Sequence, residues 1–197
     1  NHAVVLPGEV NLMTAGAGIC HTEVSATSTT ILHGLQLWTV LPDKDREGSR
    51  RFDHYAPEEI TLEGGSARVF LGSLFGQTSP VHTFTPLLGA EIHINPGEAV
   101  IFDVDPTFEH GLLVDSGEVQ LEGVTVEPTQ LAYTGINETQ LRIRNIGTTP
   151  ARTVLLGGEP FTEDIVMWWN FIGRSHDEIE EYRKQWQAES ERFGVTH

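Results

Sequence analysis

The sequence is poor in cysteine and in basic residues. Its single cysteine, Cys20, excludes an intrachain disulfide and fits a reducing compartment, so we expect a cytoplasmic protein. Lysine and arginine number 12 against 28 aspartates and glutamates, which gives a formal net charge of −16. A surface this acidic repels phosphate backbones and anionic membranes. We therefore expect neither direct nucleic-acid binding nor membrane association.

Long apolar segments and several catalytic motifs are also missing. The longest apolar runs, such as residues 153–156, are far too short to cross a bilayer. The sequence contains no Ser-His-Asp order, no Gly-x-x-x-x-Gly-Lys-Ser/Thr phosphate loop and no zinc-type cysteine pattern. No signal peptide opens the chain, which starts at Asn1 without an initiator methionine, so we expect its start to be cut.

Turn-forming residues are plentiful, with 20 glycines and 10 prolines. Short apolar segments recur between them at regular spacing, a pattern that predicts an all-β sandwich or barrel. Residues 25–30 are small and polar and form the best linker candidate, and residues 43–51 form a charged loop. The expected strands are two within residues 3–24 around a turn at Pro7, the second broken at 15–18 and resuming at 19–24, followed by 31–41, 67–74, 83–87, 90–94, 99–103, 110–114, 118–121, 130–133, 140–145 and 152–156.

The C-terminal segment has a helical pattern instead. Ser175 and Glu178 have the spacing of a capping box, in which each side chain satisfies the free backbone N–H of the other residue. We predict an amphipathic helix over about residues 176–192. Its apolar face carries Ile179, Tyr182, Trp186 and Phe193.

His21 and Glu23 are the strongest candidates for a metal site. On a strand, residues two apart point to the same face, and their Cα atoms lie roughly 6.6 Å apart, so both side chains can converge on one ion. Mixed nitrogen and oxygen ligands suit iron, copper, nickel, manganese or zinc, and the pattern does not choose among them. The competing interpretation is a surface His-Glu pair on an edge strand. Gly16 and Gly18 are expected to supply positive φ angles at the turn before the pair.

Three stretches of the sequence together resemble the pirin family. They are Pro-Gly-Glu-Val-Asn-Leu-Met-Thr-Ala-Gly-Ala-Gly-Ile-Cys-His-Thr-Glu at residues 7–23, His-Gly-Leu-Gln-Leu-Trp at 33–38, and Gly-Gly-Glu-Pro-Phe at 157–161 followed by Val-Met-Trp-Trp-Asn-Phe at 166–171. The first stretch is the most specific, because its Met-Thr-Ala-Gly-x-Gly-Ile run ends in His-x-Glu. The resemblance covers essentially the whole chain.

The resemblance implies a cupin fold with two jelly-roll β-barrels, that is, a bicupin with a C-terminal α-helix. On that basis residues 1–27 are the last part of an N-terminal metal-binding cupin, and residues 31–160 form the C-terminal cupin. Residues 161–197 would then be a strap and a helix that packs toward the N-terminal domain.

The metal of the family, iron or another divalent ion, is bound by three histidines and one glutamate of the N-terminal cupin. The resemblance assigns His21 and Glu23 to that set. The family places two further ligands in a His-x-His before this segment, and the present sequence contains no His-x-His. We therefore expect a metal site that is incomplete in this chain.

Two functions follow from the resemblance. The first is a metal-dependent quercetin 2,3-dioxygenase that acts on a flavonol-like aromatic substrate, with Glu23 as metal ligand or as catalytic base. The alternative is a non-enzymatic, metal-dependent transcriptional co-regulator or protein-interaction module, whose acidic surface would suit a basic protein partner.

The remaining candidate residues are expected to be structural. Cys20 alternates away from His21 and is interpreted as a small packed residue. Trp168 and Trp169 are expected to face opposite ways in a core or interdomain contact rather than to form an aromatic substrate platform. The C-terminal cupin is expected to be metal-free, with histidines that are solvated or hydrogen-bonded: His33, His54, His82, His93 and His110.

Overall fold

The structure is a computed structural model, and it describes residues 2–195. The chain forms two compact units. Unit 1 consists of Asn1–Leu12 and Asp53–Phe161, and unit 2 consists of Met13–Phe52 and Thr162–His197. Residues 31–52, expected in the C-terminal cupin, thus belong to the same unit as the C-terminal helix.

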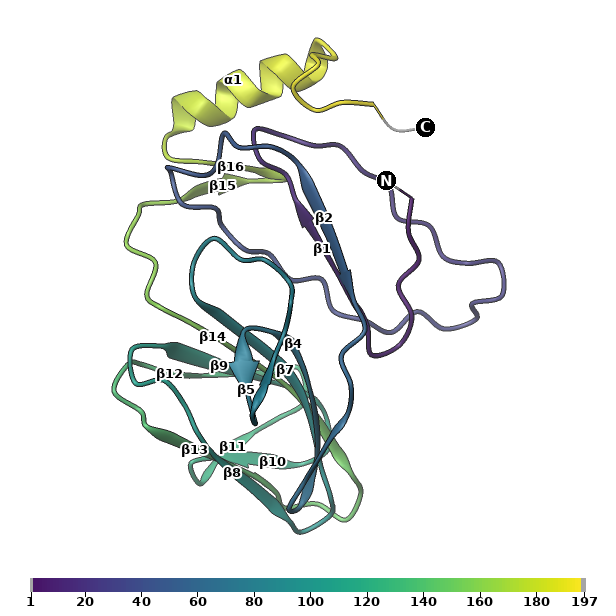
Figure 1. The fold of residues 1–197 in the computed structure, drawn as a ribbon, viewed down its shortest axis with the longest axis vertical. Coiled ribbons are helices and arrows are strands. Elements are labelled where there is room, and N and C mark those ends of the chain that lie inside the picture. Colours follow the sequence, from purple (N-terminus) through teal and green to yellow (C-terminus); the bar gives the residue numbers. More distant parts are fainter. Residues whose placement is uncertain (1, 196–197) are drawn as a thin grey trace. The chain divides into compact units, whose positions relative to one another are not determined.

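Unit 1 contains a six-stranded antiparallel sheet (Figure 1). Of its central strands, β9 (Glu109–Ser116) alternates buried and less buried residues, because successive side chains of a strand point to opposite faces, whereas β14 (Ala151–Gly158) and β7 (Leu87–Ile94) each contain a run of three buried residues. The strand order is β12 (Leu131–Thr134), β9 (Glu109–Ser116), β14 (Ala151–Gly158), β7 (Leu87–Ile94), β4 (Gly65–Leu71) and β3 (Ile60–Leu62).

A four-stranded sheet faces it across one hydrophobic core. The strand order is β11 (Val124–Val126), β10 (Val119–Leu121), β13 (Gln140–Asn145) and β8 (Ala99–Asp103). Fully buried side chains from both sheets make up the core, among them Ile92, Leu112, Val119, Leu141, Ile143 and Leu155. A short hairpin of β5 (Ser73–Leu74) and β6 (Gln77–Thr78) completes the unit. Two antiparallel sheets around one core form a jelly roll, so the all-β prediction is confirmed.

Unit 2 contains a hairpin of β15 (Val166–Trp168) and β16 (Phe171–Gly173), followed by the helix α1 (His176–Gln187). The helix packs against both strands of this hairpin. A further two-stranded sheet pairs β1 (Val10–Thr14) with β2 (Arg51–Tyr55), and the chain passes from one unit to the other within these strands. None of the helices in the described part of the chain is both long enough and apolar enough to cross a membrane.

The helix is shorter than predicted and is capped differently. It ends at Gln187, and Glu189 has a φ of 53°, which is incompatible with continuing the helix to residue 192. Half of the capping box is present, because the backbone N–H of Glu178 donates to Ser175 Oγ at 3.3 Å. The Glu178 carboxylate instead accepts from the backbone N–H of Arg174 at 2.6 Å. Ile179 is buried as predicted, whereas Trp186 is half exposed.

Four segments of the described chain that were expected in strands contain none: residues 3–6, 19–24, 31–41 and 83–86, while Leu87 begins β7. Residues 31–41 have the alternating pattern of a strand, but Leu35 and Leu37 remain exposed. Alternation predicts which side chains share a face, and it does not supply the neighbouring strand whose backbone must pair with it. Conversely, β2 begins at Arg51, the last residue of the expected charged loop, and continues through residues 52–55, where no strand was expected.

Candidate functional site

His21 and Glu23 lie close together on an extended segment of unit 2 that is not part of a strand. His21 Nε2 is 3.9 Å from Glu23 Oε1, so the two side chains are on the same side of the chain. Their side chains are 41% and 74% exposed. The two side chains lie near each other and are exposed, and the strand expected to carry them is absent, so their role in a metal site stays a prediction.

The glycines before the pair have the positive φ angles that the sequence predicts. Gly16 has a φ of 54° and Gly18 a φ of 155°. A Cβ atom on Gly16 would lie 2.1 Å from the backbone oxygen of Gly48, a distance at which only glycine fits. The backbone N–H of Ala17 donates to that same oxygen at 3.2 Å. The backbone of the turn therefore packs so closely on the loop at Gly48 that position 16 requires glycine.

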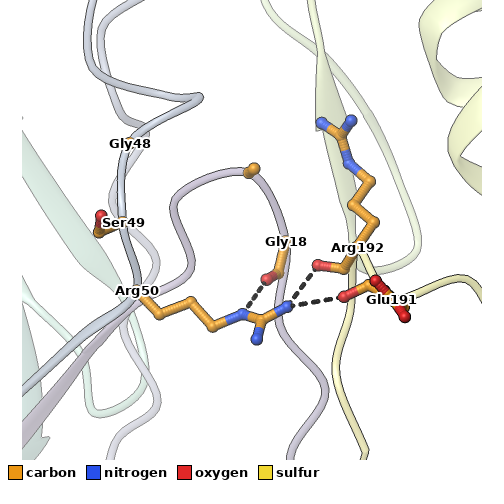
Figure 2. A pocket seen from close by; sticks show the side chains of 7 residues that line it. Gly18, Gly48, Ser49, Arg50, Glu191 and Arg192 are labelled. Carbon is orange, nitrogen blue, oxygen red and sulfur yellow. Dashed lines mark hydrogen bonds between the residues drawn. The ribbon is translucent and has the colours of Figure 1, made fainter.

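Arg50 holds the segment that leads into His21 (Figure 2). Its Nε donates to the backbone oxygen of Gly18 at 2.6 Å, and its Nη2 donates to the backbone oxygens of Arg192 and Glu191 at 2.6 and 3.3 Å. The backbone N–H of Cys20 donates to the oxygen of Phe193 at 2.8 Å. The Arg50 clamp and this bond fix the backbone on the N-terminal side of His21. Sequence reasoning missed Arg50, which lies in a segment that resembled an ordinary charged loop.

The donor chemistry of the pair fits a divalent transition metal, since an imidazole nitrogen and a carboxylate oxygen are ordinary ligands of such ions. Two donors alone are too few to complete the coordination of such an ion. Within residues 2–195, no three His, Cys, Asp or Glu side chains are grouped so that they could hold a metal ion. His21 and Glu23 can therefore serve as two ligands of a site that needs further donors.

A network of arginines and glutamates, which sequence reasoning missed, surrounds an open pocket of unit 2 lined by Asp43, Arg46, Glu163 and Arg174. Arg46 donates to both carboxylate oxygens of Glu178 at 2.8 Å. Arg174 Nε donates to Glu163 Oε2 at 2.8 Å, and its Nη2 donates to the backbone oxygen of Leu41 at 2.7 Å. These bonds join the start of α1 to residues 41–46.

The electrostatics of the network follow from these bonds. The hydrogen bond from Arg46, and then that from the backbone N–H of Arg174, lower the pKa of Glu178 to about 2. The bond from the backbone N–H of Asp43 and that from Arg174 lower the pKa of Glu163. The bond to Glu178 raises the pKa of Arg46 above its already high ordinary value. Because every charge has an opposite partner, the network is structural rather than a site that would bind an anion.

The histidines of the jelly roll fall into two groups. His54 and His93 lie near the surface, with His54 Nδ1 2.7 Å from Asn11 Oδ1 and His93 Nε2 3.3 Å from Glu91 Oε1. His110 is only 2% exposed, and neither of its ring nitrogens has a hydrogen-bond partner among the described residues. Burial lowers its pKa. The prediction of a solvated or hydrogen-bonded histidine is therefore wrong for His110, because its strand turns it inward.

Trp168 and Trp169 do not face opposite ways. Trp169 lies in the turn after β15 with a φ of 51°, and this conformation brings its ring onto that of Trp168, with centroids 5.7 Å apart and planes 17° from parallel. The guanidinium carbon of Arg183 lies 4.6 Å from the centroid of Trp168. Both tryptophans are exposed, so they are not part of a core, and the alternative expectation of an interdomain contact stays a prediction.

Two family models match the chain. The model described as the Pirin C-terminal cupin domain matches residues 89–194, and the model described as Pirin matches residues 1–39. The first match takes in most of the jelly roll together with the hairpin and helix of unit 2. The second takes in the glycine turn, His21 and Glu23.

Individual relatives give the same result. The chain is 39% identical over 195 residues to a Pseudomonas aeruginosa protein provisionally named as a quercetin 2,3-dioxygenase, and 32% identical over 193 residues to a pirin-like protein of Caulobacter vibrioides. A crystal structure of quercetin 2,3-dioxygenase from Acinetobacter baumannii superposes with a TM-score of 0.91 at 34% identity. These alignments cover 98%, 94% and 98% of this chain. They cover 61%, 65% and 64% of the respective relatives, so the chain spans less than two thirds of their length.

Proposed function

Since this chain belongs to the pirin family, within the cupin fold, we propose that it is part of a metal-dependent dioxygenase of the quercetinase type. The proposed substrate is a flavonol-like aromatic molecule, and dioxygen is the second substrate. The observation that carries the proposal is the approach of His21 and Glu23 on a segment fixed by the glycine turn and Arg50. The names of the Pseudomonas and Acinetobacter relatives support the choice of reaction.

In this proposal His21 and Glu23 bind a divalent ion, with iron as the preferred identity. The family resemblance assigns the further ligands to a His-x-His that precedes the glycine turn. A bound ion of this kind supplies Lewis acidity that polarises the oxygen substituents of a flavonol. Arg50 and the glycine turn have the positioning role, because they hold the backbone that carries both ligands.

Glu23 is the proposed base. Its carboxylate would accept the proton of a flavonol hydroxyl as the O–H bond breaks, which leaves the substrate oxygen negatively charged and the glutamate neutral. The exposed position of Glu23 leaves its oxygens accessible to a ligand. As ligand or as base, Glu23 has to be a carboxylate, and a glutamine at this position would serve poorly in either role.

The test uses the full-length gene product, because the ligand set is incomplete in the 197 residues. Metal content is measured by elemental analysis, and quercetin turnover by loss of its absorbance and by oxygen consumption. We expect His21→Ala and Glu23→Gln to reduce both bound metal and turnover at least tenfold. His54→Ala is the matched control, since His54 is a partly exposed histidine outside the proposed ligand set. Unchanged metal content in both ligand variants would reject the assignment.

The second candidate is a non-enzymatic regulator whose metal state alters a protein-binding surface. Exposed Trp168 and Trp169 favour it, because stacked aromatic rings on a surface are characteristic of protein contacts. The acidic composition favours a basic protein partner. Metal bound through His21 and Glu23 without turnover of quercetin or other flavonols would support this function over the first.

A cytoplasmic location belongs to both proposals and is supported by the single free cysteine.

A further inference from the structure

We infer that the jelly roll of unit 1 binds, at His110 and Thr134, a small uncharged molecule that carries a hydroxyl group on an aromatic body. The site lies where β9 and β12 meet two loops, residues 104–108 and 135–139. This site is separate from His21 and Glu23, and it does not depend on the proposed dioxygenase function.

His110 points into the interior of the jelly roll. It shares a face of β9 with Leu112 and Val114, which are fully buried members of the core. Both of its ring nitrogens are inaccessible to water and lack a hydrogen-bond partner among the described residues. Buried polar atoms are nearly always paired in folded proteins, so an imidazole with two unpaired nitrogens indicates a missing partner.

Thr134 provides the second, independent observation. It lies directly opposite His110 in the antiparallel register of β12 and β9, so its side chain is on the same face of the sheet. Its Oγ1 is also buried without a partner in the part of the chain that is described. On the other side, β14 places Gly157 opposite His110, and a Cβ atom there would lie 3.0 Å from His110 Cδ2. Three unpaired polar atoms therefore gather at one end of the jelly roll.

The loops beside this cluster supply apolar surface. They are bonded to each other, with the backbone N–H of Asn137 donating to the oxygen of Pro106 at 2.7 Å and that of Val104 to Thr139 at 3.0 Å. Phe108 and Val104 pack against the core but are only partly buried. The ring centroid of Phe108 lies 6.3 Å from that of His110. In the proposed complex, the aromatic body of the ligand contacts Phe108 and its hydroxyl group bonds to His110 and Thr134.

The charges around the cluster determine the class of ligand. The charged groups that act on His110 are the carboxylates of Asp105 and Glu138, which would repel an anion. Among residues 2–195, His110 belongs to no group of three or more His, Cys, Asp or Glu side chains that could hold a metal ion. Burial lowers the pKa of His110 and so favours the neutral imidazole, which has one donor and one acceptor nitrogen. A hydroxyl group can donate and accept at once, and it therefore matches both the imidazole and Thr134.

Phenol is the probe for this site, and toluene is its matched apolar control. The chain is labelled with ¹⁵N in its histidines, and the ring nitrogen shifts are followed at neutral pH during titration. We expect phenol to shift the His110 nitrogens saturably, and toluene to bind at least tenfold more weakly because it forms no hydrogen bond. Thr134→Val removes one hydroxyl at nearly constant volume, and it should weaken phenol binding about three- to tenfold. His110→Phe should abolish it.

His82→Phe is the control variant, since His82 is an exposed histidine whose ring packs edge-on against Phe84. It should leave phenol affinity unchanged. If His110→Phe fails to fold, the phenol affinity of Thr134→Val still tests the proposed site. Equal affinity for phenol and toluene, an unchanged affinity in Thr134→Val, or a crystal structure grown with phenol that shows only a water beside His110 would each overturn the inference. None of these measurements involves quercetin, so failure here leaves the proposed dioxygenase activity untouched.

Discussion

Arg46 binds Glu178 through both terminal nitrogens of its guanidinium group: Nη1 donates to Oε2 and Nη2 donates to Oε1, each at 2.8 Å. The two residues are 132 positions apart in the sequence, and both are less than one third exposed. Paired hydrogen bonds between two charges are among the strongest polar contacts in proteins, and their planar geometry fixes the orientation of both groups. This bond therefore holds the start of α1 against residues 41–46.

Arg46→Ala should lower the free energy of unfolding by about 1–3 kcal/mol, because it leaves a partly buried carboxylate without its main donor. Denaturant unfolding monitored by tryptophan fluorescence measures the effect. Arg144→Ala removes an arginine from an exposed position of β13 and serves as the control, with an expected change below about 0.5 kcal/mol. Equal effects of the two substitutions would show that the paired bond contributes nothing specific.

The lowered pKa of Glu178 predicts how stability depends on acid. The hydrogen bond from Arg46 and that from the backbone N–H of Arg174 bring this pKa to about 2, from an ordinary value of 4.5. The unfolded chain binds the proton more readily, so the contribution of Glu178 is complete above about pH 4.5 and is lost as the pH falls toward 2. Urea unfolding between pH 2.5 and 5.5 should show a shallower pH dependence in Glu178→Gln than in the wild type. Parallel curves would contradict the assignment.

His110 predicts a second pH effect, in a different window. Burial lowers its pKa below the ordinary 6.5, so the unfolded chain takes up a proton at a pH where the folded chain does not. Its contribution is complete above about pH 6.5 and decreases as the pH falls below that value. In His110→Phe the loss of stability between pH 7 and 5 should be smaller than in the wild type. His82→Phe, which changes an exposed ring, should retain the wild-type slope.

Gly16→Ala and Gly76→Ala separate the cost of a positive φ angle from the cost of a steric collision of the added Cβ atom. Both glycines have positive φ angles, 54° and 75°. A Cβ on Gly16 would collide with the Gly48 oxygen, whereas a Cβ on Gly76 would meet nothing within 4 Å. We expect Gly76→Ala to cost about 1–2 kcal/mol for its backbone conformation alone, and Gly16→Ala to cost clearly more. Melting temperatures of both variants measure this, and similar values would mean that the turn at Gly16 adapts readily.

The strands of the jelly roll were largely predictable from the sequence, and in β8, β9 and β13 every second side chain is buried. Residues 99–103 and 140–145 were expected as strands and are the bounds of β8 and β13. Alternation misled at residues 31–41, where no strand pairs with the backbone. It would also have placed His110 inside, on the face of Leu112 and Val114, had that pattern been given more weight than the polarity of the residue.

The candidate site was predictable only in part. The spacing of His21 and Glu23 indicates that they meet, and the glycines before them indicate a turn. The Arg50 clamp could not be inferred, because it ends on backbone oxygens, which carry no signature in the sequence. The same holds for the Arg46–Glu178 pair, whose partners are chosen by the fold rather than by spacing along the chain.

The Arg50 clamp has a consequence for biosynthesis. Arg50 and the oxygen of Arg192 that it binds are separated by 142 residues. At a translation rate of about 5–20 residues per second, roughly 7–28 s pass between the synthesis of the two. The jelly-roll strands from β3 to β14 are complete before then and can fold during translation, whereas the segment leading to His21 must wait without its clamp. A nascent chain stalled before Glu191 would therefore expose this segment to proteases and chaperones at the ribosome.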